Sequence, residues 1–126
     1  MSWLSKVAPE RATALLTLAA GVALAEAVEH VTGLAPSIKW PNDLLVGRRK
    51  LAGILAEGIA SGGTGGVQAV VLGYGINILP AAFPPDLATI ATSLETELGR
   101  AVDRHAVCAE SLAALAARYD DLLSGR

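Results

Sequence analysis

The stretch at residues 39–57, KWPNDLLVGRRKLAGILAE, decides how this chain folds, because it places two turns between strand-like segments. In PND, proline fixes φ while the asparagine and aspartate side chains bond their own backbone, which is typical of a turn. Two lysines, two arginines, an asparagine and an aspartate gather in this stretch. The rest of the chain up to residue 94 carries few charges outside one helix. The cluster is therefore either a solvated hairpin or a site for a charged ligand.

The region from Ser37 to Ile78 predicts three or four strands of one antiparallel sheet. Segments rich in β-branched and apolar residues alternate there with turn-forming residues. The link SGGTGG at residues 61–66 is predicted to be flexible, and the run VQAVVLGYGINI after it predicts the last strand.

Helices are predicted before and after these strands. Pro9 suits the first turn and Gly33 the end of a long apolar helix that is buried on most of its surface. A short helix is expected at residues 94–98, ended by Gly99, and Asp103 suits the N-cap of a last helix. The apolar face of that last helix is expected to comprise Cys108, Leu112, Leu115, Tyr119 and Leu122. This order predicts one α+β domain over residues 1–126, with a mainly antiparallel sheet packed against helices.

Composition restricts the class of protein. Of the 126 residues, 52% are hydrophobic and 17% charged, which excludes a disordered chain. The net charge of −2 argues against a nucleic-acid partner. The apolar run at residues 12–27 resembles a secretory signal, but it contains Glu26 and falls short of the ~20 residues that span a bilayer. With a single cysteine, Cys108, the chain is expected to be cytoplasmic, without a membrane partner.

The basic hairpin allows two interpretations. In KLAGIL, strand alternation predicts that Lys50, Ala52 and Ile54 share one face and that Gly53 and Leu55 lie on the other, together with Leu51. A glycine in mid-strand often marks a backbone that a ligand approaches closely. The alternative is a hairpin with a solvated basic tip at residues 48–49 and an Asx turn at residues 42–43.

A ligand interpretation gives each polar residue of this hairpin a task. Two ammonium groups, Lys39 and Lys50, with the amide of Asn42, would suit a carboxylate or a phosphate. Asp43 could bind a magnesium ion, orient a lysine or poise a proton transfer.

The strand VVLGYGINI at residues 70–78 offers a second candidate feature. Gly73 and Gly75 alternate, which removes side chains from one face and predicts a slot, and Asn77 continues the same alternation. An Asn amide offers a donor and an acceptor, the complement of an adenine edge. Alternatively, the glycines make room for the long helix and Asn77 only ends the strand.

These two motifs resemble those of the biotin protein ligases, which join biotin to a lysine of carboxylase carrier domains. KWPNDLLVGRRKLAGILAE resembles the family signature, VVLGYGINI its glycine-rich strand, and ATSLETELGRAVDR with its flanking helices fits the expected order. The resemblance covers nearly the whole chain. It implies the biotin–lipoate ligase catalytic fold, which is similar to class II aminoacyl-tRNA synthetases.

The resemblance implies a two-step reaction with ATP and Mg²⁺. Biotin and ATP would give biotinyl-5′-AMP and pyrophosphate, and the lysine of a biotin carboxyl carrier domain would then attack the mixed anhydride. By position in the motifs, Lys50 and Asp43 would be catalytic, and Asp43 would also be the metal ligand. The residues implied to bind substrate and ATP are Lys39, Trp40, Asn42, Lys50, Gly53, Leu55, Gly73, Gly75 and Asn77.

The chain also departs from the family pattern. Family members carry a Ser-Thr-Asn segment and a GRGRxGR-type loop ahead of this region, and neither occurs in the 126 residues. We therefore expect a partial catalytic domain, truncated on its N-terminal side and prone to self-association or homodimerisation. The alternative function is a non-catalytic remnant that binds nucleotide weakly or acts only by association.

Overall fold

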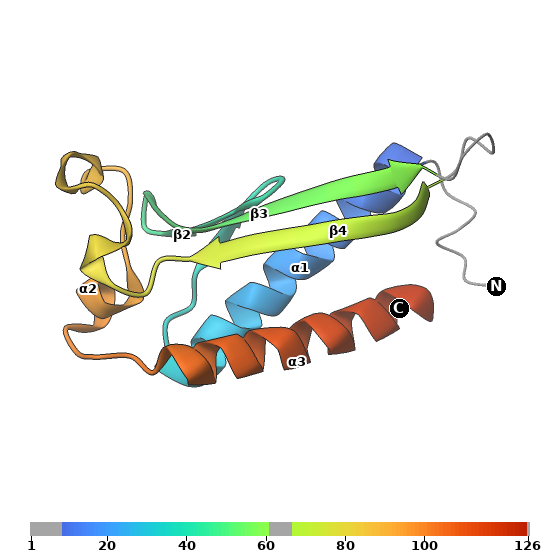
Figure 1. Cartoon of the computed structure of the whole chain (residues 1–126). Helices are drawn as coiled ribbons and strands as arrows, with labels where there is room; N and C mark the ends of the chain where they lie inside the picture. The colour runs from blue at the N-terminus through green and yellow to red at the C-terminus, as the bar shows by residue number, and fades with distance from the viewer. Residues whose placement is uncertain (1–8, 61–66, 126) are drawn as a thin grey trace.

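The computed structural model describes residues 9–60 and 67–125, in which a four-stranded sheet lies against two long helices (Figure 1). The described elements follow in the order α1 (Pro9–Thr32), β1 (Ser37–Lys39), β2 (Asp43–Val46), β3 (Arg49–Ala60), β4 (Val67–Ile76), η2 (Pro80–Ala82), η3 (Pro85–Leu87), α2 (Leu94–Leu98) and α3 (Arg104–Leu123). The predicted α+β class is confirmed.

The strands form a simple meander. Their order in the sheet is β1-β2-β3-β4, and each neighbouring pair is antiparallel. The turn at residues 47–48 joins β2 to β3, and Gly47 adopts a left-handed φ of 62° there. The link predicted to be flexible, at residues 61–66, lies outside the described residues.

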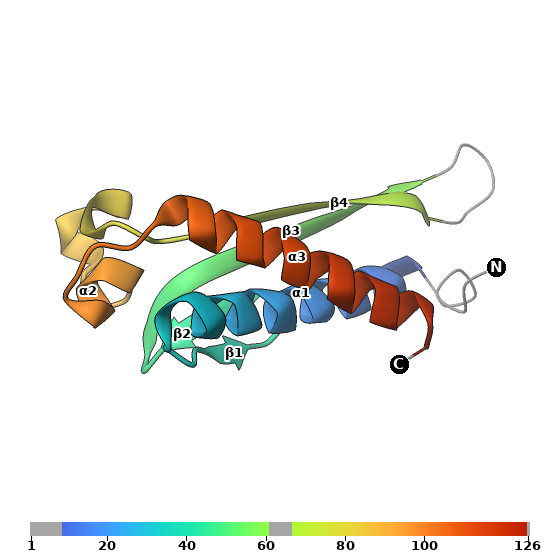
Figure 2. The same ribbon diagram turned by 90° about the horizontal axis from the view of Figure 1, so that it is seen from below.

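Helices α1 and α3 cover the same face of the sheet (Figure 2). The predicted end of α1 is confirmed, because Gly33 takes a left-handed φ of 80° and its N–H donates to Glu29 O at 2.8 Å. Part of α1, Arg11–Thr32, is long and apolar enough to cross a membrane by length and composition, a test that buried helices of soluble proteins also pass. In this fold it forms the core, with Ala23, Leu24 and Val28 fully buried.

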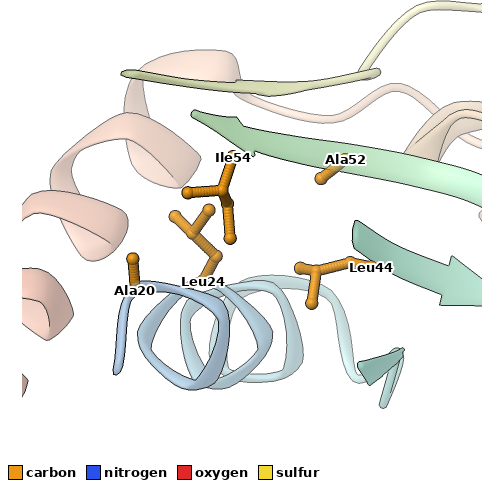
Figure 3. Packing of buried hydrophobic residues seen from close by; sticks show 5 residues of the cluster. All are labelled: Ala20, Leu24, Leu44, Ala52 and Ile54. Carbon is orange, nitrogen blue, oxygen red and sulfur yellow. The ribbon is translucent and has the colours of Figure 1, made fainter. Parts of the chain in front are cut away.

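A first core cluster lies between α1 and the sheet. The side chains of Leu24 from α1, Leu44 from β2 and Ile54 from β3 point into the same space (Figure 3). Ala20 and Ala52 complete the cluster, and these small residues let the helix lie close to the strands. Because Ile54 and Ala52 face the helices, Gly53 between them faces the opposite side, which we call the open face.

A β-bulge in β3 corrects one prediction from the sequence. Leu44 pairs with Ala52 but Leu45 pairs with Lys50, so Leu51 is an extra residue in the strand. The predicted alternation was therefore wrong at this point. Leu51 is fully buried in a second cluster with Val28, Leu94 and Val107, and Lys50 lies on the same face as Gly53.

The C-terminal elements begin and end where expected. Ser93 caps α2 by accepting from the Thr96 N–H, and Gly99 ends it with a φ of 67°. The Asp103 carboxylate accepts from the N–H groups of His105 and Ala106 at the start of α3.

The predicted apolar face of α3 was right at Leu115, which packs against the first core cluster, and wrong at Cys108, which is exposed. Val107 and Ser111 are the buried residues of this helix, whereas Leu112 and Tyr119 are exposed. Ser111 can be buried because its hydroxyl bonds Tyr74 Oη at 2.7 Å and donates to Cys108 O at 2.8 Å.

Candidate functional site

Four candidate residues form one row across the whole sheet. Lys39 of β1 pairs with Asp43 of β2, Asp43 pairs with Gly53 of β3, and Gly53 pairs with Gly75 of β4. Residues directly opposite one another in a sheet project to the same face. The register therefore places these four positions on the open face, although they lie far apart in the sequence.

Lys50 joins this row because of the bulge. Its Nζ lies 3.2 Å from Asp43 Oδ1, with side chains 51% and 24% exposed. An ideal Cβ on Gly53 would lie only 3.2 Å from both Cε and Nζ of Lys50. Glycine at position 53 thus leaves the space through which the lysine side chain reaches the aspartate.

Beside this ion pair, the open face exposes backbone because glycines occupy it. Gly73 pairs with Leu55 and would place a Cβ only against Leu55 O at 3.9 Å, while a Cβ on Gly75 would meet no described atom within 4 Å. Leu55 and Val71 are 61% and 56% exposed. The glycines do not make room for a helix, so this part of the alternative interpretation was wrong. β4 ends at Ile76, directly before Asn77. The glycines leave a strip of accessible backbone with apolar side chains beside it.

Asn77 directly follows β4. Beyond this point, residues 90–92 instead of β4 bond to the start of β3. The Lys50 N–H donates to Ile90 O and the Thr92 N–H donates to Lys50 O, both at 2.9 Å, which forms a parallel bridge between Lys50 and Ala91. The Asn77 amide nitrogen donates to Thr92 O at 3.1 Å. One segment, residues 88–92, therefore contacts the backbone of Lys50 and the side chain of Asn77.

The other predicted residues lie at the margin of the row. Lys39, Trp40 and Asn42 are exposed, with Trp40 at 59%. Asn42 O accepts from the Ile54 N–H at 2.9 Å, so the backbone of the PND turn is held against β3. The side chains of all three are accessible to a ligand at this end of the open face.

Arg49 is not part of a solvated tip, contrary to that interpretation of the sequence. It is the first residue of β3, and its Nη2 lies 2.6 Å from Glu97 Oε2 in α2. Arg48, in the turn, is exposed. Sequence reasoning missed Thr92 and Glu97, and only the tightly spaced polar residues of ATSLETE could have drawn attention to them.

Few side chains that could bind a metal ion lie near Asp43. In the part of the chain that the structure describes, there is no group of three or more His, Cys, Asp or Glu residues that could hold a metal ion. Mg²⁺ needs only one or two protein carboxylates when substrate phosphates supply further oxygens. Asp43, with one oxygen bonded to Lys50, fits that role but not a metal site made of protein ligands alone.

A separate recess lies near the end of β4 and the start of α3. It is lined by apolar residues that include Ile76, Ile78 and Val102, with Asp103 and His105 at its polar side. None of the predicted site residues lines it. The candidate site is thus the open face around Lys50 and Asp43 rather than this recess.

Known proteins with similar sequences point to one family. The model of the biotin/lipoate A/B protein ligase family matches residues 3–77. The bifunctional ligase/repressor BirA of Bacillus subtilis is 39% identical over 118 residues, which cover 92% of this chain and 36% of that protein. The biotin--[acetyl-CoA-carboxylase] ligase of Mycobacterium tuberculosis is 40% identical over 114 residues, 87% of this chain and 39% of that protein.

A solved structure agrees with these relatives. The biotin protein ligase from Aquifex aeolicus in complex with biotin and ATP superposes with a TM-score of 0.75 at 27% identity, covering 88% of this chain and 45% of that one. The chain thus spans well under two thirds of the relatives it matches. The resemblance inferred from the motifs is confirmed: the chain belongs to the biotin/lipoate A/B protein ligase family.

Proposed function

We propose that this chain carries the adenylate-forming part of a biotin protein ligase. In the proposed reaction the biotin carboxylate attacks the α-phosphorus of ATP, pyrophosphate leaves, and biotinyl-5′-AMP forms. A carrier-domain lysine then attacks the acyl carbon and AMP leaves. The main support is the cross-strand row, which sets an ammonium group and a carboxylate beside a strip of bare backbone.

Lys50 is the residue proposed to act on the reacting atoms. Its ammonium group is half exposed and held over Gly53 by Asp43. From there it could contact both the biotin carboxylate and the α-phosphate. Its positive charge would stabilise negative charge that develops on the reacting oxygens. Lys39, at the β1 end of the row and paired with Asp43, would add a second positive charge for the phosphates.

The glycine strip is proposed to receive the two ends of the intermediate. The backbone at Gly53 and Leu55 would line the biotin slot, with Gly73 opposite Leu55 on the neighbouring strand. Asn77 would read adenine through Oδ1 and the amide hydrogen that Thr92 does not use. Trp40 and Asn42 would border the site at the PND turn.

Asp43 is proposed to hold Mg²⁺ together with ATP phosphates. The ion would neutralise charge on those phosphates when bound. The partner in the second step is proposed to be a biotin carboxyl carrier domain, and the site of action to be the cytoplasm.

The test compares Lys50→Ala with Arg48→Ala, an exposed arginine in the adjacent turn. Calorimetry with a non-hydrolysable biotinyl-5′-AMP analogue should show that Lys50→Ala weakens binding more than about tenfold, because a charge-assisted contact is worth roughly 1.5–3 kcal/mol. Arg48→Ala should bind as the unmodified chain does, and both should melt normally. Equal, small effects of the two variants would overturn the role of Lys50.

A second candidate is a non-catalytic chain that binds nucleotide weakly or acts by association. It is supported by the exposed apolar side chains of Leu55 and Val71 on the open face, which suit association with another chain. Two forms should be titrated: the 126-residue chain, and the chain joined to the preceding half of a family ligase. Binding by the joined form alone would favour this second candidate for the chain by itself.

A further inference from the structure

The 88–92 segment is held in place by one carboxylate that touches neither Lys50 nor Asn77. Glu97 Oε2 accepts from Thr92 Oγ1 at 2.7 Å and from Arg49 Nη2 at 2.6 Å. Arg49 also donates through Nη1 to Ala88 O at 3.4 Å. The carboxylate therefore joins the first residue of β3 to both ends of the segment.

The bonds at the Glu97 carboxylate are partly shielded from water, whereas the Arg49 side chain is 37% exposed and its bond to Ala88 O is exposed. The Glu97 side chain is only 17% exposed and Thr92 is fully buried. Charge-assisted hydrogen bonds in such a setting are stronger than those at an exposed surface. Glu97 can thus fix the segment more firmly than its two backbone bonds to Lys50 would alone.

We propose that Glu97 is a positioning residue for the site. By holding Thr92 and Arg49, it fixes the 88–92 segment against β3, and the segment in turn sets the backbone of Lys50 and the amide of Asn77. The inference rests on the proposed function for its ligand, but the contacts that it concerns exist without one.

The role is separable from the folding of α2. That helix keeps its Ser93 cap, its buried Leu94 and the bond from the Val102 N–H to Glu95 Oε2 at 2.9 Å. Glu95 is therefore a matched control: it lies two residues from Glu97 on the same short helix, and its carboxylate is bonded to the far connection instead of the site.

The first experiment uses the unliganded 126-residue chain. Amide hydrogen exchange followed by NMR should become about tenfold faster at Lys50 and Thr92 in Glu97→Ala, because their bonds to the segment loosen. The Ile54 amide, bonded to Asn42 O, should exchange as before, and Glu95→Ala should leave all three unchanged. Unaltered exchange at Lys50 and Thr92, or equal acceleration at Ile54, would overturn the inference.

The second experiment measures affinity for the biotinyl-5′-AMP analogue. Glu97→Ala should weaken binding by about three- to tenfold, which lies within the roughly two- to thirtyfold effects of mutations along a packed network. The melting temperature should follow that of Glu95→Ala. Thr92→Val, which loses the hydroxyl, should behave as Glu97→Ala does, and Thr92→Ser, which keeps it, should restore affinity. An affinity that Glu97→Ala leaves intact would overturn the positioning role. If the 126-residue chain alone does not bind, the variants are compared in the joined form. Failure of the unmodified joined form to bind would refute the proposed function, and the exchange experiment would still decide the role of Glu97.

Discussion

At the scale of single residues, the site depends on positions that carry no side chain. Gly53 and Gly75 face one another across β3 and β4, yet their surroundings differ. A methyl group on Gly53 would press on the end of the Lys50 side chain, whereas one on Gly75 would meet no described atom within 4 Å. A substitution at Gly53 therefore tests the position of the Lys50 side chain, and a substitution at Gly75 tests whether a ligand uses the open face.

Gly53→Ala should weaken binding of the adenylate analogue several-fold and change the free energy of unfolding by less than about 1 kcal/mol. The flexible end of Lys50 can move away from the new methyl group at small cost, but it then loses its place beside Asp43. Calorimetry and urea denaturation would measure the two effects. A variant that binds normally would show that the lysine need not lie over this glycine.

Gly75→Ala is the matched substitution with the opposite effect on stability. It should stabilise the chain by about 0.4–1 kcal/mol, because alanine restricts the unfolded state and meets no obstacle in the folded one. If the ligand lies on the glycine strip, the same methyl group should nevertheless reduce its affinity. Unchanged affinity would place the ligand elsewhere.

Sequence alternation correctly predicted which glycines share a face, but it placed Lys50 on the wrong one. The reason is the bulge at Leu51, which depends on the pairing of β3 with β2. A local pattern contains no information about an extra residue in a ladder. Strand periodicity alone placed Lys50 with Ala52 and Ile54, whereas the bulge places it with Gly53 on the open face.

At the scale of elements, the ends of helices were predictable and their buried faces were less so. The caps at Ser93, Gly99 and Asp103 use short-range bonds, which local sequence determines. The buried face of α3 instead depends on Tyr74, a β4 residue that bonds Ser111. Without that distant partner, a serine is predicted to lie at the surface and Leu112 in the core.

Asp103→Ala should destabilise the chain by about 1 kcal/mol, because two N–H groups of the first turn of α3 lose their acceptor. Asp103→Ser should retain most of the stability, since a hydroxyl can cap the same groups. Urea denaturation followed by circular dichroism would measure both. Equal losses for the two variants would mean that the carboxylate acts through charge rather than as a cap.

At the scale of the whole molecule, the elements described in residues 9–60 and 67–125 cover one face of the sheet and leave the other open. Helices α1 and α3 shield one side, and the exposed Leu55 and Val71 lie on strands whose other face meets those helices (Figure 1). Exposed apolar side chains beside an edge strand such as β4 favour association between chains. We therefore expect the chain to associate through the open face around Leu55 and Val71.

The purified chain should show concentration-dependent association in sedimentation velocity, and Val71→Lys should reduce it. Val71 pairs with Glu57, so the new ammonium group would gain an opposite charge across the strands while interrupting the apolar surface. Leu112→Lys, on the exposed side of α3, is the control. A larger effect at Leu112 would move the contact to the helices, and a sharp monomer at all concentrations would refute the expectation.

The open face also bears on catalysis. An adenylate bound over Gly53 and Gly75 would meet water on the side where the described residues provide no cover, and a reactive mixed anhydride is then hydrolysed. The isolated 126-residue chain is therefore expected not to biotinylate a carrier domain at a useful rate. Transfer of labelled biotin to a purified carrier domain is the measurement, and stoichiometric labelling by the chain alone would contradict the prediction.

The connection between Asn77 and the 88–92 segment has a consequence for how the protein can vary. At its first end, Asn77 O and Ile78 O accept from the N–H groups of Leu94 and Glu95. At its last end, the backbone of Lys50 bonds Ile90 and Thr92. Lengthening a surface loop costs little, about 0.6 kcal/mol for each doubling. Residues 79–83, which precede the bonds that Leu87 O accepts from Ile90 and Ala91, should thus accept insertions, or even an attached domain, without disturbing the chemistry beside them. Related chains would then be free to acquire new attachments at this corner while keeping the same pair of lysine and asparagine.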